Sequence, residues 1–103
     1  MSDHIISIQN SINYINSHLE DDLSPEILAG KANYSLFHFC RMFKEVTGES
    51  VMRYVREKRM EMAISDMKEG RSLADIAVKC GYETTSGFSR AYKRQFGRRP
   101  EKS

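Results

Sequence analysis

Two short segments of the sequence place basic, aromatic and small polar side chains on one face of a helix. In the first segment, positions i, i+3, i+4 and i+7 hold Phe37, Cys40, Arg41 and Lys44. In the second segment, the same positions hold Ser86, Ser89, Arg90 and Lys93. Arginine can bond guanine through two hydrogen bonds, serine can contact a base edge or a phosphate, and lysine neutralises phosphate. Taken singly, each of these side chains is more often an ordinary solvent-exposed residue. The same combination at equivalent positions of two segments, however, is typical of a helix surface that binds in the DNA major groove.

Enzyme chemistry finds little support in the same residues. Cys40 lies close to His38 in the sequence, but side chains two residues apart on a helix diverge and cannot form a thiol–imidazole pair. There is no phosphate-binding loop, paired-carboxylate site or nucleophile elbow. The two cysteines and three histidines lack the spacing of metal ligands. We therefore expect a protein that is not an enzyme, with no cofactor and no metal.

Composition and charge set the broad class of the protein. The 103 residues are 40% hydrophobic and 29% charged, which suits one compact domain or two small ones. No apolar run approaches the roughly 18 residues of a membrane helix, and the N-terminus lacks a signal peptide, so we expect a cytoplasmic, nucleoid-associated protein without a membrane partner. Residues 1–35 are net acidic, whereas residues 86–99 hold five basic residues and no acid. Such a charge run fits a solvated face as well as a polyanion-binding surface.

The elements that must position these side chains are all helical. Apolar residues recur at three- and four-residue steps, serine or threonine precedes most of the periodic segments, and glycine or asparagine ends them. The pattern predicts an all-α fold of six to seven helices, over about 5–19, 25–32, 36–46, 51–68, 73–80 and 85–96. The expected N-caps are Ser24, Ser35, Ser50, Ser72 and Thr84.

An internal repeat organises these helices. A shift of 48 residues aligns Ser24 with Ser72 and Tyr34 with Tyr82, and a shift of 49 aligns Arg41 with Arg90. Each copy has a short helix, a turn residue, an aromatic residue and a longer basic helix, which is the helix-turn-helix plan. We predict a first motif in residues 1–49, a linker helix in 50–69 and a second motif in 70–103, together forming one DNA-binding domain. A merely structural repeat of helix pairs is the alternative.

The linker bears on how two such motifs would meet DNA. Successive major grooves on one face of a duplex lie about 34 Å apart. A helix over residues 50–68 spans about 28 Å, which is slightly short. We therefore expect either that the DNA bends or that the second motif engages incompletely.

The two motifs and their spacer resemble the DNA-binding domain of AraC/XylS-type bacterial transcription regulators, with the layout of the MarA/SoxS/Rob-like group. The resemblance covers about residues 8–100 and is carried by segments 23–29, 34–35, 39–44, 47–48, 54–56 with Arg59, 76–77, 81–82, 88–93 and 96–97. It implies a monomer that binds an asymmetric site in double-stranded promoter DNA and activates transcription through RNA polymerase, with one helix of each motif in a major groove.

The same resemblance assigns candidate contacts. Base-facing positions fall on Phe37, Cys40, Arg41, Thr85, Ser86, Ser89 and Arg90. Phosphate contacts fall on Lys44, Lys93, Arg94, Ser35 and Thr84. Phe37 stands where MarA-like proteins have tryptophan and could pack on a thymine methyl group. Alternatively, its ring starts the helix and folds back onto the domain.

Three departures from the family pattern qualify this assignment. Asn33 occupies a position where glycine is usual. Gly87 lies within the second reading helix, where glycine costs about 1 kcal/mol of helix stability and removes a contact, so we rely more on the first motif. Residues 100–103 stop before the expected aromatic-arginine ending, so the parent chain could carry a separate effector-binding domain. The competing function is a helical protein-interaction module that does not bind DNA, built on the exposed Phe37 and the acidic first helix.

Overall fold

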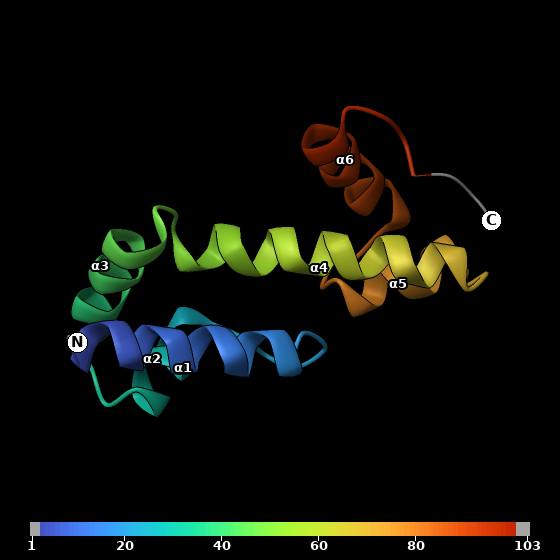
Figure 1. Ribbon diagram of the computed structural model, residues 1–103. Coiled ribbons are helices and arrows are strands. Elements are labelled where there is room, and N and C mark those ends of the chain that lie inside the picture. The colour runs from blue at the N-terminus through green and yellow to red at the C-terminus, as the bar shows by residue number, and fades with distance from the viewer. Residues whose placement is uncertain (1–2, 101–103) are drawn as a thin grey trace. The chain divides into compact units, whose positions relative to one another are not determined.

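The computed structural model describes residues 3–100, which form six helices (Figure 1). The helices are α1 (Asp3–Ser17), α2 (Pro25–Lys31), α3 (Leu36–Thr47), α4 (Val51–Lys68), α5 (Leu73–Lys79) and α6 (Thr85–Phe96). No strand occurs among these residues, so the all-α prediction is confirmed. Within the same range, no helix is both long and apolar enough to cross a membrane.

The chain divides into two compact units, and the boundary between them in the sequence falls within α4. Unit 1 extends to Val55 and unit 2 begins at Arg56. The three-part division at residues 49 and 69 stays a prediction. The expected departure from the family ending, at residues 101–103, lies outside the described residues.

Hydroxyl side chains begin the helices as predicted. The side-chain oxygens of Ser24, Ser35, Ser72 and Thr84 each accept a hydrogen bond from the backbone N–H three residues later, at 3.0–3.2 Å. Ser50 Oγ accepts from the N–H of Arg53 in the same way, at 3.2 Å. Because the first N–H groups of a helix have no partner within it, these bonds fix where each helix starts.

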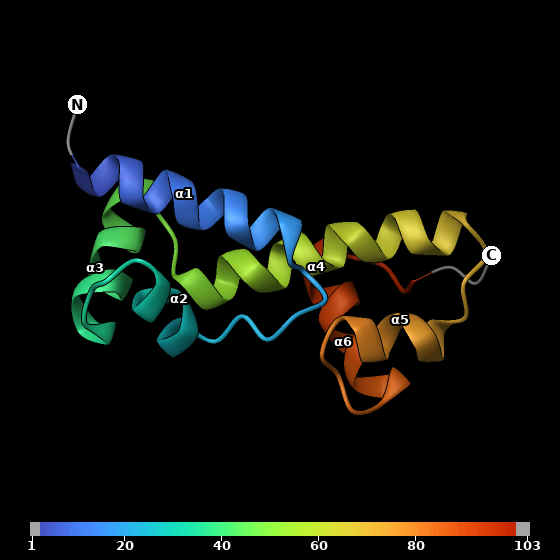
Figure 2. The same ribbon diagram turned by 90° about the horizontal axis from the view of Figure 1, so that it is seen from below.

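Unit 1 is built on apolar side chains from α1, α2, α3 and the start of α4. Figure 2 shows α2 and α3 packed beneath α1. Ile8, Ile15 and Leu28 meet Phe39 and Phe43 in a core from which water is almost completely excluded. The buried apolar face of α1 is shorter than the spacing of apolar residues in its sequence suggests: Ile5 fits that spacing but is 46% exposed. The buried residues of α1 begin only at Ile8.

Unit 2 has its own core, formed by the rest of α4 with α5 and α6. Met60, Ala63, Ile76 and Phe88 are among its most buried residues. A buried carboxylate also lies in this unit: Asp66 accepts from Lys79 Nζ at 3.0 Å, and Arg71 Nε lies 3.5 Å from its other oxygen. The two cations compensate a charge that could not be buried alone without a large loss of hydration energy.

The turn that joins the two helices of each motif is the same in both units. In unit 1, the N–H of Tyr34 donates to the carbonyl of Ala29 at 3.0 Å, and Asn33 has φ +62°. In unit 2, Tyr82 donates to Ala77 at 2.9 Å, and Gly81 has φ +88°. Both turn residues adopt the left-handed conformation that ends a helix, which asparagine tolerates and glycine adopts freely. The repeat of helix, turn and helix is thus present in the backbone hydrogen bonds.

The change of repeat shift from 48 to 49 also has a structural cause. Ser35 follows Tyr34 directly and caps α3, whereas Glu83 separates Tyr82 from the cap Thr84. The second turn is therefore one residue longer than the first. Both longer helices then end alike, at Gly48 and Gly97, with left-handed φ values of 85° and 76°.

Candidate nucleic-acid interface

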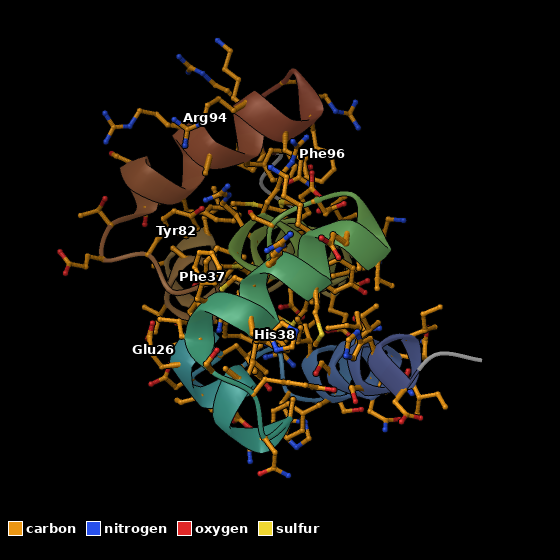
Figure 3. The ribbon with its side chains drawn as sticks, turned by 90° about the vertical axis from the view of Figure 1, so that its left-hand side faces the viewer. Glu26, Phe37, His38, Tyr82, Arg94 and Phe96 are labelled. Atoms are coloured by element: carbon orange, nitrogen blue, oxygen red, sulfur yellow. The ribbon has the colours of Figure 1, made fainter. Side chains whose placement is uncertain are left out.

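In unit 1, α3 has one buried face and one exposed face. Phe39, Met42 and Phe43 are buried, as the spacing predicts. On the other side Phe37, Arg41 and Lys44 are exposed, and Cys40 is half-buried against the edge of the core. Phe37 is 77% exposed, so its ring does not fold back onto the domain (Figure 3). This exposed side of α3, comprising Phe37, Cys40, Arg41 and Lys44, is called here the α3 outer face.

In unit 2, α6 repeats the same division. Phe88, Ala91 and Tyr92 are buried. The α6 outer face comprises Thr85, Ser86, Ser89, Arg90, Lys93 and Arg94, all exposed except the half-buried Ser89. Figure 3 shows Arg94 and Phe96 on different sides of α6. Apart from the half-buried Cys40 and Ser89, the predicted site residues on both helices are therefore exposed.

The two caps lie where a phosphate could reach them. The Ser35 and Thr84 oxygens accept from the N–H groups of His38 and Gly87, and both residues are exposed. Accepting these bonds leaves each hydroxyl proton available to donate to a further oxygen. The N-terminus of a helix also carries a partial positive charge that favours phosphate.

The charges on the two outer faces differ in their partners. On α3, Arg41 Nε donates to Glu45 Oε1 at 3.3 Å, and both side chains are about two-thirds exposed. On α6, Arg90 and Lys93 form no ion pair with any described carboxylate. Glu45 was not among the predicted site residues, although an arginine and a glutamate four residues apart on a helix are expected to meet.

A shallow groove of about 500 Å³ lies beside the α3 outer face. Phe37 and Cys40 line it from α3, together with Pro25 from the start of α2 and Met52 from α4. The last two residues were not among the predicted site residues. They could not be found from helix spacing, because they reach the groove only through the packing of α2 and α4 on α3. The groove places apolar surface next to the cations of Arg41 and Lys44.

Gly87 occupies a tight place at the start of α6. Its N–H donates to Thr84 Oγ1 at 3.0 Å, and a Cβ atom at this position would lie 3.2 Å from that oxygen. The same Cβ would be 3.8 Å from the ring of Tyr82. The Cβ of any larger residue at this position would therefore point toward the capping hydroxyl of Thr84 and the ring of Tyr82.

Other ligand chemistry has little basis in the described part of the chain. Between residues 3 and 100, no three side chains of histidine, cysteine, aspartate or glutamate are grouped so that they could hold a metal ion. Burial raises the pKa of the Cys80 thiol to about 11, and Cys80 Sγ donates to the carbonyl of Arg59 at 3.4 Å. This thiol is a core group and not a reactive one.

Comparison with known proteins gives consistent matches over most of the chain. A sequence-family model described as "Helix-turn-helix domain" matches residues 28–103. Regulatory protein SoxS of Escherichia coli K12 is 35% identical over 94 residues, which cover 90% of this chain and 88% of SoxS. Right origin-binding protein of the same strain is also 35% identical, but this chain spans only 32% of its length.

A solved structure supports the same relationship. The C-terminal domain of AraT, a response regulator from Geobacillus stearothermophilus, superimposes with a TM-score of 0.83 and 30% sequence identity. The match covers 91% of this chain and 79% of that domain. The order of six helices described above is therefore that of a known group of domains.

Proposed function

The chain belongs to the AraC-type family of helix-turn-helix DNA-binding transcription regulators, and from this premise we propose that it binds a specific site in double-stranded promoter DNA and regulates transcription. The observation that carries the proposal is the exposed basic face found twice, on α3 and on α6, each backed by buried aromatic residues. A structural helix repeat would need the buried faces but would not need equivalent cations outside them.

On α3, we assign base contacts to Phe37, Cys40 and Arg41. The exposed guanidinium of Arg41 can form two hydrogen bonds with guanine, which is the commonest specific contact in the major groove. The Phe37 ring and the apolar groove beside it suit the methyl group of thymine. Lys44 and the hydroxyl of Ser35 would contact phosphates on either side of this reading surface.

On α6, we assign base contacts to Thr85, Ser86, Ser89 and Arg90. Hydroxyl groups can donate to or accept from several base edges, so the specificity of this helix would depend mainly on Arg90. The phosphate contacts would be Lys93, Arg94 and Thr84. The two helices would enter successive major grooves, with a bent duplex or incomplete engagement of α6 if the linker helix is short for that spacing.

The finer features of the proposal follow from family membership. We propose that the chain acts as a monomer in the bacterial cytoplasm, near the nucleoid, and activates transcription through contact with RNA polymerase. Two matched relatives are named as regulators, Transcriptional regulator Rob of Salmonella typhimurium and Regulatory protein SoxS of Escherichia coli, which supports a role without catalysis.

The test is selection of binding sites from a random pool of duplexes, followed by titration of a selected duplex at several salt concentrations. We expect an enriched motif, with two half-elements about one helical turn apart if both helices read DNA. Affinity should fall steeply as salt rises, because bound lysine and arginine release condensed counterions. An unenriched pool together with salt-independent affinity would favour the protein-interaction module instead.

A further inference from the structure

A pocket of about 340 Å³ lies between α1 and α2, within unit 1. Tyr14 and the buried Ser11 line it from α1, and Leu28 and Lys31 line it from α2. Its volume lies within the range of sites that hold small molecules. None of the lining residues belongs to the α3 outer face, so the pocket is separate from the DNA contacts assigned above.

Lys31 alone carries a charge among the residues that line this pocket. Its side-chain Nζ lies over the ring of Tyr14, 4.8 Å from the ring centre. No carboxylate between residues 3 and 100 forms an ion pair with this ammonium group. The aromatic ring attracts the cation but covers only one side of it, so N–H donors of Lys31 remain available to an anion.

Unit 2 shows the same lysine with an anion in place. Lys31 ends α2 and Lys79 ends α5, and each stands three residues before the tyrosine of its turn. In unit 2, Lys79 Nζ donates to the buried carboxylate of Asp66 at 3.0 Å. The two lysines are therefore equivalent in the repeat but differ in what they meet.

The helices that precede α2 and α5 also match each other. The buried residues of α1 at positions 8, 11 and 15 have the same spacing as the buried residues of α4 at positions 60, 63 and 67. In this register Tyr14 takes the position of Asp66. Unit 1 therefore has the lysine of the buried ion pair, but an aromatic ring stands where unit 2 supplies the carboxylate.

The polar groups of the pocket suit a carboxylate that has an apolar body. Ser11 Oγ already donates its proton to a backbone carbonyl of α1, at 3.1 Å, so it cannot donate to an anion. The ammonium of Lys31 and the side-chain amide of Asn10 can do so. Leu28, which is 1% exposed, and the ring of Tyr14 give the pocket apolar walls.

We propose that this pocket binds a small organic carboxylate, with its charged group on Lys31 and its apolar part against Leu28. The ligand supplies in unit 1 the negative charge that Asp66 supplies in unit 2. This site goes beyond the proposed DNA binding and does not depend on it. The hydroxyl of Ser7, which also lines the pocket, lies 3.5 Å from the hydroxyl of Tyr34, so an occupied pocket adjoins the turn before α3.

The main experiment titrates the intact chain with benzoate, benzamide and acetate and follows the backbone amide NMR signals of α1 and α2. Benzamide has nearly the shape of benzoate but no charge, whereas acetate has the charge but no ring. We expect saturable shifts at Ser11 and Leu28 with benzoate. Benzamide should bind about 3- to 10-fold more weakly, because it loses the charge-assisted hydrogen bond to Lys31.

Each probe can contradict a different part of the proposal. No saturable shift with benzoate, or equal affinities for benzoate and benzamide, would overturn the carboxylate site. Acetate that binds as tightly as benzoate would overturn the requirement for an apolar body and would leave a site for a simple anion.

Lys31→Gln, compared with Lys68→Gln, tests the role of the ammonium group. Each lysine is exposed and lies in the last turn of its helix, and circular dichroism confirms that each variant remains helical. We expect Lys31→Gln to bind benzoate and benzamide with equal affinity, whereas Lys68→Gln keeps the preference for benzoate. A preference that survives in Lys31→Gln would show that this lysine does not hold the carboxylate.

Tyr14→Asp, compared with Tyr14→Asn, tests the equivalence between the two units. An aspartate at this position gives Lys31 a partner within the chain, as Asp66 does for Lys79, and should abolish the preference for benzoate over benzamide. Asparagine has nearly the same size but no charge, so the preference should remain. An equal preference in the two variants would overturn the equivalence with the ion pair of unit 2.

Discussion

Arg41 and Glu45 are joined by a hydrogen bond of 3.3 Å on the exposed side of α3, from Nε of the arginine to Oε1 of the glutamate. The bond occupies only one of the guanidinium's donors, so both Nη groups remain available to a base. At the same time it places a carboxylate beside the surface that would meet DNA phosphates. If Arg41 reads a base as proposed, Glu45 would orient its guanidinium and would also oppose non-specific binding.

Replacing Glu45 by glutamine should strengthen DNA binding but reduce discrimination. The loss of one repelled carboxylate should raise affinity for a random duplex about 2- to 5-fold, in keeping with the modest energies of exposed charge pairs. The gain for a specific site should be smaller, because Arg41 is less well oriented. Fluorescence anisotropy titrations with both duplexes give the ratio of the affinity for the specific site to the affinity for the random duplex.

The matched control is Glu69→Gln. Glu69 accepts from Arg71 at 3.3 Å and is also exposed, but it lies just beyond the end of α4, in unit 2, and not on α3. For Glu69→Gln we expect the same ratio of specific to random affinity as for the unchanged chain. A fall in random-duplex affinity for Glu45→Gln would contradict the role given to this carboxylate.

Arg41→Ala and Lys44→Ala should separate reading from positioning on α3. Arg41→Ala should cost about 1–3 kcal/mol of binding to the specific site and relax selection at one base pair. Lys44→Ala should weaken all duplexes by similar factors, because it removes a phosphate contact. Repeating site selection with each variant shows which base preference is lost. Equal binding of specific and random duplexes by Arg41→Ala, with no preference lost, would refute the assignment of the α3 outer face.

Asp66→Ala should destabilise unit 2 strongly. The carboxylate is only 8% exposed, and its removal takes away the acceptor of the 3.0 Å hydrogen bond from Lys79 Nζ. Breaking a buried pair in this way costs about 3–5 kcal/mol, whereas Glu61→Ala, which removes an exposed partner of Lys58, should cost less than about 1 kcal/mol. Urea denaturation followed by circular dichroism measures the free energy of unfolding of both variants. Similar losses for the two variants would show that the buried pair is not a major source of stability.

The Cys80 thiol should make stability depend on alkaline pH. Its pKa is raised from 9.0 to about 11 in the folded chain, chiefly by burial, so the folded state holds the proton more tightly than the unfolded state. The associated stability is fully present below pH 9 and is lost as pH rises from about 9 to 11. Cys80→Ala should flatten this part of the stability profile. An unchanged profile would show that other groups control it.

The two cysteines should also differ in reactivity at neutral pH. Cys40 is half-buried at the α3 outer face, whereas Cys80 is 5% exposed. A thiol reagent should therefore modify Cys40 first and reach Cys80 only after unfolding, with Cys40→Ser as the control. Rapid labelling of Cys80 in the folded chain would contradict the burial seen here.

The sequence was sufficient for the helices and the repeat because their determinants are local. Hydroxyl caps, left-handed turn residues and apolar spacing act within a few residues, and Ser35, Asn33 and Phe39 all behave as their types predict. Ile5 is exposed although it fits the apolar spacing of α1, because this spacing cannot show where the neighbouring elements end. The pairing of Asp66 with Lys79 depends on α4 packing against α5, which no helix pattern encodes.

The extra residue Glu83 has a consequence for anyone who would exchange specificity between the two copies. A graft aligned on Tyr34 and Tyr82 would shift the transplanted residues by one position and rotate them by about 100° around the axis of α6. Cys40 and Lys44 would then fall at the positions of the buried Phe88 and Tyr92. A graft aligned on Ser35 and Thr84 would keep them outside, so the capping hydroxyls are the correct origin for counting.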